Sequence, residues 1–152
     1  MIVDHICFAV KDLDEAVAYW GRAFGYEQQT GKVVNSRQGV TVTFLAKADS
    51  LTVKLIEPLD HNQSLLDFVR KGGGFHHLCF KCDDLGETVE ELKEQGLRTL
   101  VAPQPGEAFN NHEIAFMRAR HGLNIEIIDT DERASRLEPR RVDSPQDSPG
   151  EC

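Results

Sequence analysis

The chain has 152 residues, 40% hydrophobic and 28% charged, a composition typical of a single globular domain. Its 25 acidic and 17 basic residues give a net charge of −8, which argues against nucleic acids and anionic membranes as main partners. No apolar run approaches the roughly 20 residues that a membrane-spanning helix needs, and the first residues lack the pattern of a signal peptide. These features predict a cytoplasmic protein that binds neither nucleic acid nor membrane.

The four cysteines, Cys7, Cys79, Cys82 and Cys152, are therefore expected to be reduced thiols. Cys79 and Cys82 are spaced as in redox or zinc motifs, but strand alternation would point their side chains to opposite faces. No second pair of this spacing is present to complete a zinc site. The sequence favours buried cysteines within strands.

An internal repeat organises the chain. At an offset of 72 residues, the segment 5–8 (HICF) aligns with 77–80 (HLCF), and Asp12-Leu13 aligns with Asp84-Leu85. The same offset aligns 51–57 (LTVKLIE) with 123–129 (LNIEIID). A single offset that holds from the start to the end of each segment predicts two copies of one supersecondary unit.

Each copy begins with a strand, followed by an aspartate at a helix N-cap position and a glycine where the helix should stop. These features are residues 3–10, Asp12 and Gly25 in the first copy, and residues 75–82, Asp84 and Gly96 in the second. Three further strands follow in each copy, predicted at 31–35, 40–46 and 51–57 and at 98–102, 113–118 and 123–129.

The two copies predict an α+β fold. A short helix at 64–70 and the glycines at 72–74 link them, and the composition after residue 130 offers little to bury. The expected segments are a first βαβββ module, a linking helix with a glycine-rich turn, a second βαβββ module and a polar C-terminal tail, at residues 1–60, 61–74, 75–130 and 131–152.

The repeat brings four side chains to equivalent positions near the expected two-fold axis. His5 and His77 begin equivalent strands, and Lys54 and Glu126 occupy equivalent points of the last strands. A histidine at the start of a strand is more often a hydrogen-bonded core residue than a ligand, but here both copies carry one. Two imidazoles and a carboxylate suit a divalent metal in the range from manganese to zinc.

Three further observations bear on this site. Glu126 lies within an otherwise apolar strand, so its carboxylate needs a metal or a cation to offset its desolvation. Strand alternation points His76 to the face opposite His77. His121 precedes Gly122 in the turn before the Glu126 strand, where it would line the mouth of the pocket.

These residues resemble the vicinal oxygen chelate superfamily, which includes glyoxalase I, extradiol dioxygenases, and fosfomycin and bleomycin resistance proteins. The likeness covers residues 2–129, and within the superfamily it is greatest to the methylmalonyl-CoA epimerase branch. The matching segments are HICFAVKDL at 5–13, GV at 39–40, EPL at 57–59, GFHHL at 74–78, IAFM at 114–117 and LNIEI at 123–127.

The resemblance implies two paired βαβββ modules that form an open, U-shaped mixed sheet around one central pocket. It implies a homodimer, a small-molecule substrate, and His5, His77 and Glu126 as ligands of Co, Mn, Ni or Zn. In the epimerase branch the metal stabilises the enolate of a thioester while carboxylates move the α-proton. A Lewis acid on the carbonyl oxygen lowers the barrier of such a step by several kcal/mol.

The chain departs from the family pattern at two places. The remaining metal position normally carries Glu or Gln, whereas the repeat places Lys54 there, and an ammonium has no lone pair and repels a cation. Epimerases tend to carry an acidic residue just before the Gln-Gly-Val segment, whereas Ser36-Arg37 precede Gln38 here.

Three functions are therefore open. The first is a metal-dependent isomerase or epimerase that acts through a metal-stabilised enolate on a small carbonyl or acyl-CoA substrate. Its catalytic residues would be Glu126 and Lys54, with Lys54 displaced or deprotonated by the metal's charge so that it can carry a proton. The second is a metal-free protein that binds a drug or metabolite, with Lys54 paired to Glu126 in place of the metal. The third is a structural or interaction role, for which nothing in the sequence argues specifically.

Overall fold

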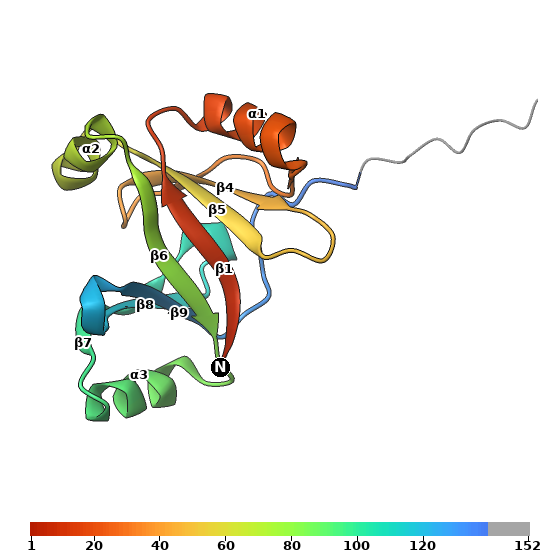
Figure 1. Ribbon diagram of the computed structural model, residues 1–152. Helices are drawn as coiled ribbons and strands as arrows, with labels where there is room; N and C mark the ends of the chain where they lie inside the picture. Colours follow the sequence, from red (N-terminus) through yellow and green to blue (C-terminus); the bar gives the residue numbers. More distant parts are fainter. Residues whose placement is uncertain (140–152) are drawn as a thin grey trace, which may run out of the picture.

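The computed structural model describes residues 1–139, which form one nine-stranded sheet with three α-helices and two short 3-10 helices (Figure 1). The first half contains β1 (Ile2–Ala9), α1 (Leu13–Phe24), β2 (Glu27–Gln28), β3 (Val33–Asn35), β4 (Val40–Ala46), β5 (Thr52–Pro58) and α2 (Gln63–Arg70). The second half contains β6 (Gly74–Lys81), α3 (Leu85–Glu94), β7 (Arg98–Pro105), η1 (Glu107–Phe109), β8 (Glu113–Arg118), η2 (Arg120–Gly122) and β9 (Asn124–Ile128). The predicted α+β fold is confirmed.

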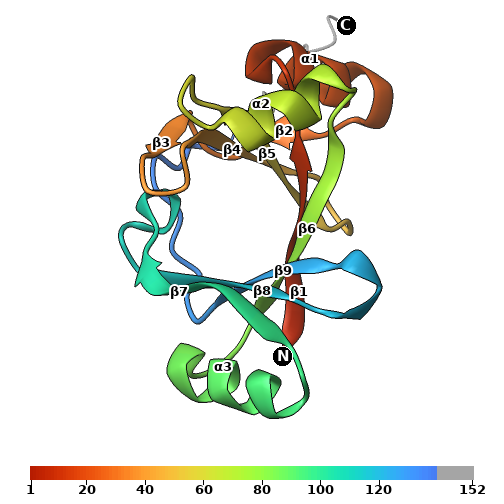
Figure 2. The ribbon, with the colours of Figure 1, turned by 90° about the vertical axis from the view of Figure 1, so that its left-hand side faces the viewer.

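The sheet is built around β1 and β6, which lie antiparallel at its centre. Its strand order is β2-β4-β5-β1-β6-β9-β8-β7, with β3 paired to β4. β1 pairs in parallel with β5, and β6 pairs in parallel with β9, so the two halves repeat the same connection. Figure 2 shows the sheet curled so that β4 and β5 face β8 and β9, with β1 and β6 on one side. The strands that begin and end the repeat therefore meet at the centre.

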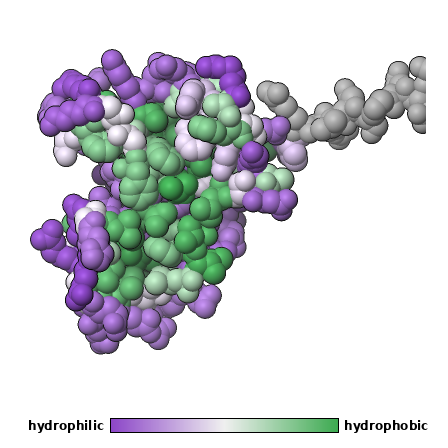
Figure 3. All heavy atoms as spheres, in the orientation of Figure 1, coloured by the Kyte–Doolittle hydropathy of each residue, from purple (hydrophilic) through white to green (hydrophobic). Residues whose placement is uncertain are grey.

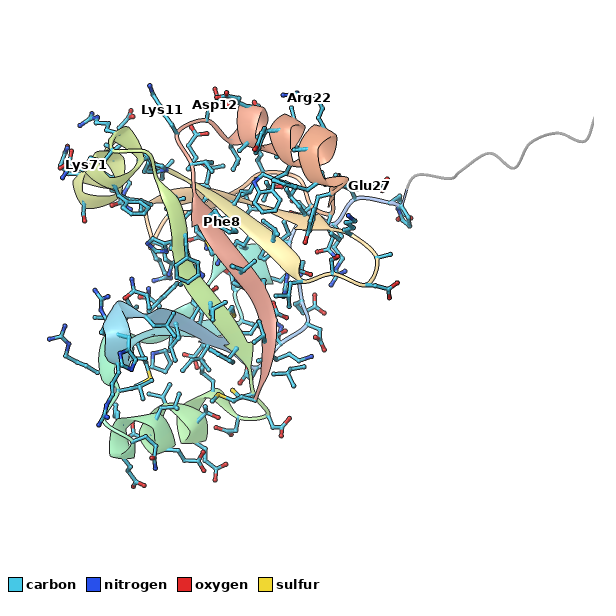
Figure 4. The ribbon with its side chains drawn as sticks, in the orientation of Figure 1. Phe8, Lys11, Asp12, Arg22, Glu27 and Lys71 are labelled. Atoms are coloured by element: carbon cyan, nitrogen blue, oxygen red, sulfur yellow. The ribbon has the colours of Figure 1, made fainter. Side chains whose placement is uncertain are left out.

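The helices begin where the sequence predicts. The carboxylate of Asp12 accepts a hydrogen bond from the N–H of Glu15, and Asp84 does the same for Glu87. Asp12 lies just ahead of the first turn of α1 in Figure 4. Gly25 ends α1 in the left-handed conformation, as expected for a helix stop.

Three apolar clusters hold the layers together. One lies under α1 and includes Leu13 and Leu55, and another lies under α3 and includes Leu85 and Ile127. The third fills the concave side between the two halves and contains Phe109. Figure 3 shows hydrophobic residues gathered across the middle of one face, over β1 and β6, with hydrophilic residues over the helices. Along β1 and β6, buried residues alternate with partly exposed ones, so burial on the concave face fixes the centre of the sheet.

Each central strand carries one extra residue just before its histidine. The register between β1 and β6 skips Asp4 in β1 and His76 in β6, which are equivalent positions of the repeat. Such a bulge re-aims the extra side chain. His76 consequently lies beside His77 and lines the same cavity, so the prediction that it points to the opposite face is wrong.

The two halves meet again on the side away from β1 and β6. The side chain of Asn35, at the end of β3, accepts a hydrogen bond of 2.7 Å from the N–H of Ala108 in η1. The backbone N–H and hydroxyl of Ser36 both donate to the carboxylate of Glu107. The open sheet is therefore bridged across its concave side.

A segment after β9 adds a second bridge. It runs from the second half to the first (Figure 2). The N–H of Ala134 donates to the carbonyl of Ala108 in η1 of the second half, and the N–H of Gly31 in the first half donates to the carbonyl of Ser135. The sequence predicts a polar tail at 131–152. Residues 131–139 of that stretch pack across the two halves, and residues 140–152 lie outside the described residues.

The element boundaries lie close to the predicted ones. The strands predicted at 40–46 and 113–118 have those bounds, and the other predicted strands differ mainly at their ends. The sequence does not predict β2, because two residues carry no readable periodicity.

Cys7, Cys79 and Cys82 are free thiols, and Cys79 and Cys82 pack in different clusters, as predicted. Within residues 1–139, no helix combines the length and apolar character needed to cross a membrane.

The turn between α2 and β6 depends on glycine at one position. Gly73 has φ +61°, and a Cβ added there would lie 2.4 Å from the carbonyl oxygen of Ala9. Gly122, in the turn before β9, has a similar φ of +73°, but a Cβ added there would come no closer than 3.9 Å to another atom of residues 1–139. We expect Gly73→Ala to lower the free energy of unfolding by about 2–4 kcal/mol, measured by urea denaturation, because backbone strain and a clash add. Gly122→Ala is the matched control, because it has a similar φ without the clash, and should cost about 1–2 kcal/mol. Equal losses in the two variants would contradict this description of the turn.

Candidate functional site

The four predicted side chains meet at the centre of the molecule. His5 comes from β1, Lys54 from β5, His77 from β6 and Glu126 from β9, and each is at most 2% exposed. His5, His77 and Glu126 each place one potential metal-binding atom within 4.8 Å of the other two. These three residues are called the central triad below. The structure thus brings together the residues that the repeat singles out.

Glu126 is the hub of this cluster. Lys54 Nζ lies 2.9 Å from both Oε1 and Oε2 of Glu126, so the ammonium is held by the whole carboxylate. His5 Nε2 and His77 Nε2 lie 2.9 Å and 3.1 Å from Oε2. Lys54 Nζ also lies 5.1 Å from the ring centroid of Phe109, within cation–π range. Every contact to Glu126 therefore comes from a nitrogen that can donate.

The charges of this pair stabilise each other. Burial alone would raise the pKa of Glu126, but Lys54 and the two histidines lower it well below its usual range. Burial alone would lower the pKa of Lys54, but the adjacent carboxylate raises it above its ordinary value. A buried ammonium and a buried carboxylate are therefore the stable forms of this pair.

His5 is placed between two carboxylates. Its Nδ1 lies 2.6 Å from Oδ1 of Asp4, and its Nε2 faces Glu126. Burial would raise the pKa of Asp4, but its hydrogen bond to His5 and the charge of Arg133 lower it overall. A neutral imidazole has one N–H, so it can donate to only one of these two carboxylates at a time.

Arg133 completes this side of the cluster. It is 7% exposed, forms an ion pair with Asp4, and lies 4.7 Å and 4.8 Å from the ring centroids of Phe44 and Phe109. A guanidinium stacked on two rings and paired with a carboxylate is a well-satisfied buried cation. The segment after β9 thus contributes directly to the environment of His5.

His77 and His76 form the other side. Because His77 Nε2 donates to Glu126, a neutral His77 has its lone pair on Nδ1, which lies 2.8 Å from Nδ1 of His76. Burial lowers the pKa of His77 to about 3 despite its hydrogen bond to Glu126, and burial and Lys54 lower the pKa of His76. His76 therefore donates its Nδ1 proton to His77.

A cavity of about 630 Å³ opens beside the cluster. Lys54, His76 and His77 line it, together with Arg37. None of the residues of the described chain that line the cavity is an aspartate or a glutamate. Its apolar wall consists of Val40, Ile56, Leu65, Phe68, Phe75, Leu100, Val101 and Phe116.

The cavity wall contains polar atoms without partners. Both side-chain atoms of the Gln38 amide and Oδ1 of Asn124 are buried and find no hydrogen-bond partner within residues 1–139. A buried polar atom left unpaired costs about 1–3 kcal/mol. These atoms can be satisfied by a ligand in the cavity, and they offer it both donors and acceptors.

A metal does not fit the central triad as it stands. The Lys54 ammonium lies on both carboxylate oxygens that would bind the ion, and it repels a cation. Nε2 of His77 donates a hydrogen bond to the same carboxylate and presents no lone pair there. The predicted roles of His5, His77 and Glu126 as metal ligands, and of Glu126 and Lys54 as catalytic residues, stay predictions.

The sequence missed several parts of the site. Asp4 could have been found, because it precedes His5 as His76 precedes His77 in the repeat. Arg133 lies beyond the end of the repeat in a polar stretch, so no pattern marks it. Gln38 gives no local signal either. His121, expected at the mouth, is exposed, and its neighbour Gly122 lines the cavity instead.

Comparisons with known proteins place this architecture in a family. The model of the glyoxalase/bleomycin resistance protein/dioxygenase superfamily matches residues 4–116. The chain belongs to this superfamily, which confirms the resemblance seen in the sequence.

Within the superfamily, the relatives include acyl-CoA epimerases. An ethylmalonyl-CoA/methylmalonyl-CoA epimerase of Cereibacter sphaeroides is 28% identical over 129 residues, covering 82% of this chain and 95% of that protein. The crystal structure of methylmalonyl-CoA epimerase from Mycobacterium tuberculosis has a TM-score of 0.73 at 29% identity and covers 84% of this chain and 86% of its own. A variant of the Streptomyces coelicolor epimerase in complex with 2-nitronate-propionyl-CoA has a TM-score of 0.73 at 26% identity, covering 85% and 96%. The open sheet seen here is thus the fold of these proteins.

The ion pair at the hub predicts a strong dependence on Lys54. Lys54→Met leaves the Glu126 carboxylate buried without a cation and should lower the free energy of unfolding by about 3–5 kcal/mol, measured by urea denaturation. The double variant Lys54→Met, Glu126→Gln should lose less than the sum of the two single variants. Lys93→Met, which breaks an exposed pair with Glu90, is the control and should change stability by about 0.5 kcal/mol or less. A Lys54→Met protein as stable as the wild type would refute the buried pair.

The depressed pKa values predict acid sensitivity. In the folded protein His77 stays neutral down to about pH 3, whereas in the unfolded chain it binds a proton below about pH 6.5. The unfolded state therefore binds more protons between these values, and the free energy of unfolding decreases as the pH falls from about 6.5 to 3. The depressed pKa of Glu126 acts in the same direction below about pH 4.5. Urea denaturation at a series of pH values should show this slope. His77→Asn should flatten it between pH 6.5 and 4.5, whereas the exposed His112→Asn should not, and identical slopes in both variants would contradict the assignment.

Proposed function

We propose that this protein binds a small carbonyl compound of the acyl-CoA type in the cavity, with the Lys54 ammonium in the place of the family's divalent metal. The observation that carries the proposal is the position of Lys54 Nζ, 2.9 Å from both oxygens of Glu126 and at the cavity wall. An ammonium has three N–H bonds, and Glu126 accepts two of them. The third can be donated to a carbonyl oxygen of a ligand.

The rest of the cavity supports this ligand class. The unpaired amide of Gln38 and the oxygen of Asn124 can hydrogen-bond a polar acyl group, and the apolar wall can cover its hydrocarbon part. Arg37, at the cavity, can attract a carboxylate or phosphate. The relatives named for acyl-CoA substrates make a CoA thioester the first ligand to test.

An isomerase that moves the α-proton of an acyl-CoA is the second candidate. The epimerase relatives favour it, and the Lys54 cation could stabilise an enolate oxygen in the role predicted for a metal. Against it stands the lack of a carboxylate among the described residues of the cavity wall, because the resemblance assigns proton transfer to carboxylates. Ser36 and Arg37 occupy the place where that acid is expected, and Ser36 is instead bound to Glu107. The metal-dependent isomerase predicted from the sequence would additionally require Lys54 to leave Glu126.

Calorimetric titration of the chelator-treated full chain with methylmalonyl-CoA tests the binding proposal. We expect binding without added metal. Gln38→Met should weaken it by about tenfold, the cost of one lost hydrogen bond, yet leave stability unchanged or higher, because an unpaired buried amide is removed. Gln63→Met, on the exposed side of α2, is the matched control and should bind like the wild type. Absence of binding without metal, or equal affinity in the Gln38 and Gln63 variants, would overturn the proposal.

Proton exchange separates the two candidates. In deuterated water, an isomerase replaces the α-hydrogen of methylmalonyl-CoA by deuterium faster than buffer does, and NMR of the thioester detects this. A binding protein leaves the buffer rate unchanged, which is the result that we expect.

A further inference from the structure

Residues 1–139 contain three clusters of potential metal ligands, each of which includes His5 or His77. Two of these clusters already hold a cation of the protein itself. The central triad holds Lys54. A first lateral triad, Asp4, His5 and Cys79, holds Arg133, which is ion-paired with Asp4 and whose charge also acts on Cys79. Two of the three clusters thus bind positive charge of the protein itself.

The third cluster is the symmetry mate of the first lateral triad. This second lateral triad consists of Cys7, His76 and His77, which are the positions 72 residues from Cys79, Asp4 and His5. Both bulges described above place a side chain beside the histidine that follows it. The first half has a carboxylate paired with Arg133 where the second half has a second imidazole. No lysine or arginine of the described chain is hydrogen-bonded to the second lateral triad, although the charge of Lys54 acts on Cys7, His76 and His77. A thiolate at Cys7 would supply the negative charge that offsets this repulsion of a bound ion.

The donor atoms of this triad are close enough to share one ion. Nδ1 of His76 and Nδ1 of His77 lie 2.8 Å apart, and Cys7 and the two histidines each offer one atom within 4.8 Å of the others. The lone pair on Nδ1 of His77 faces this side, because its Nε2 donates to Glu126. An ion would replace the proton that the two imidazoles share, moving them slightly apart to the spacing of zinc-bound nitrogens.

We propose that the second lateral triad, Cys7, His76 and His77, binds a thiophilic divalent ion such as Zn²⁺. His76 and His77 line the cavity, which gives the ion access and leaves its fourth position open to water or a ligand. This site shares His77 with the central triad but uses Nδ1 of that residue rather than Nε2, and it uses neither His5 nor Glu126. It does not depend on the proposed function, which concerns the ligand held by Lys54 and Gln38.

The charge balance selects the ion. Cys7 must lose its proton to bind; burial raises the pKa of this thiol, while the nearby Lys54 lowers it. A fully buried thiol loses its proton only when the incoming ion bonds strongly to sulfur. We therefore expect Zn²⁺, Cd²⁺ and Co²⁺ to bind, and Mg²⁺ and Ca²⁺ not to bind. The released proton leaves to solvent through the cavity.

Titration of the full chain with Co²⁺, followed by absorption spectroscopy, tests this site. The wild type should bind one equivalent and show the near-ultraviolet thiolate-to-cobalt charge-transfer band, which Zn²⁺ should displace. Cys7→Ser should lose the band and bind at least about 100-fold more weakly, and His76→Asn, at a half-buried position, should weaken binding by about 10–100-fold. Cys82→Ser, a free thiol in another cluster, is the control and should keep the band.

His5→Asn distinguishes the two metal positions, because it removes a ligand of the central triad only. We expect it to keep the band. No cobalt uptake by the wild type, a band that survives Cys7→Ser, or binding that is lost in His5→Asn but kept in His76→Asn would each overturn the proposal. None of these outcomes bears on metal-free binding of methylmalonyl-CoA, so the two proposals fail separately.

Discussion

The structure depends on one buried ion pair. Lys54 and Glu126 come from equivalent strands of the two halves and meet at the two-fold axis, where burial would make either charge unstable alone. Two halves related by this repeat place like positions face to face. One of the two positions carries a cation and the other an anion, so the axis is neutral and the halves are held together there.

The same pair changes the chemistry available to the fold. In a metal site, the carboxylate and the imidazole lone pairs converge on an ion. Here the carboxylate of Glu126 receives hydrogen bonds from Lys54 and His77, so the donor and acceptor roles of the cluster are reversed. The hydrogen bond between His5 and Asp4 is the kind of contact that orients a metal-bound histidine. The framework of a metal centre is therefore present, with an internal ammonium in it.

Much of this could be predicted from the sequence. The offset of 72 residues aligns His5 with His77 and Lys54 with Glu126, and it predicts both the fold and the members of the central cluster. Two copies of one unit related by a two-fold axis bring equivalent residues together near that axis. The side of His76 could not be predicted, since strict alternation ignores the bulge that a single extra residue creates. Arg133 could not be predicted either, because its burial depends on stacking against Phe44 and Phe109, which lie far from it in the sequence.

The buried pair should persist when divalent metal is present, with Lys54 still bound to Glu126. A crystal structure of the protein soaked in Zn²⁺, with anomalous scattering measured at the zinc edge, tests it most directly. We expect Lys54 Nζ to remain within hydrogen-bond distance of Glu126, with no anomalous peak bonded to that carboxylate. A peak bonded to His5, His77 and Glu126, with Lys54 displaced, would contradict it.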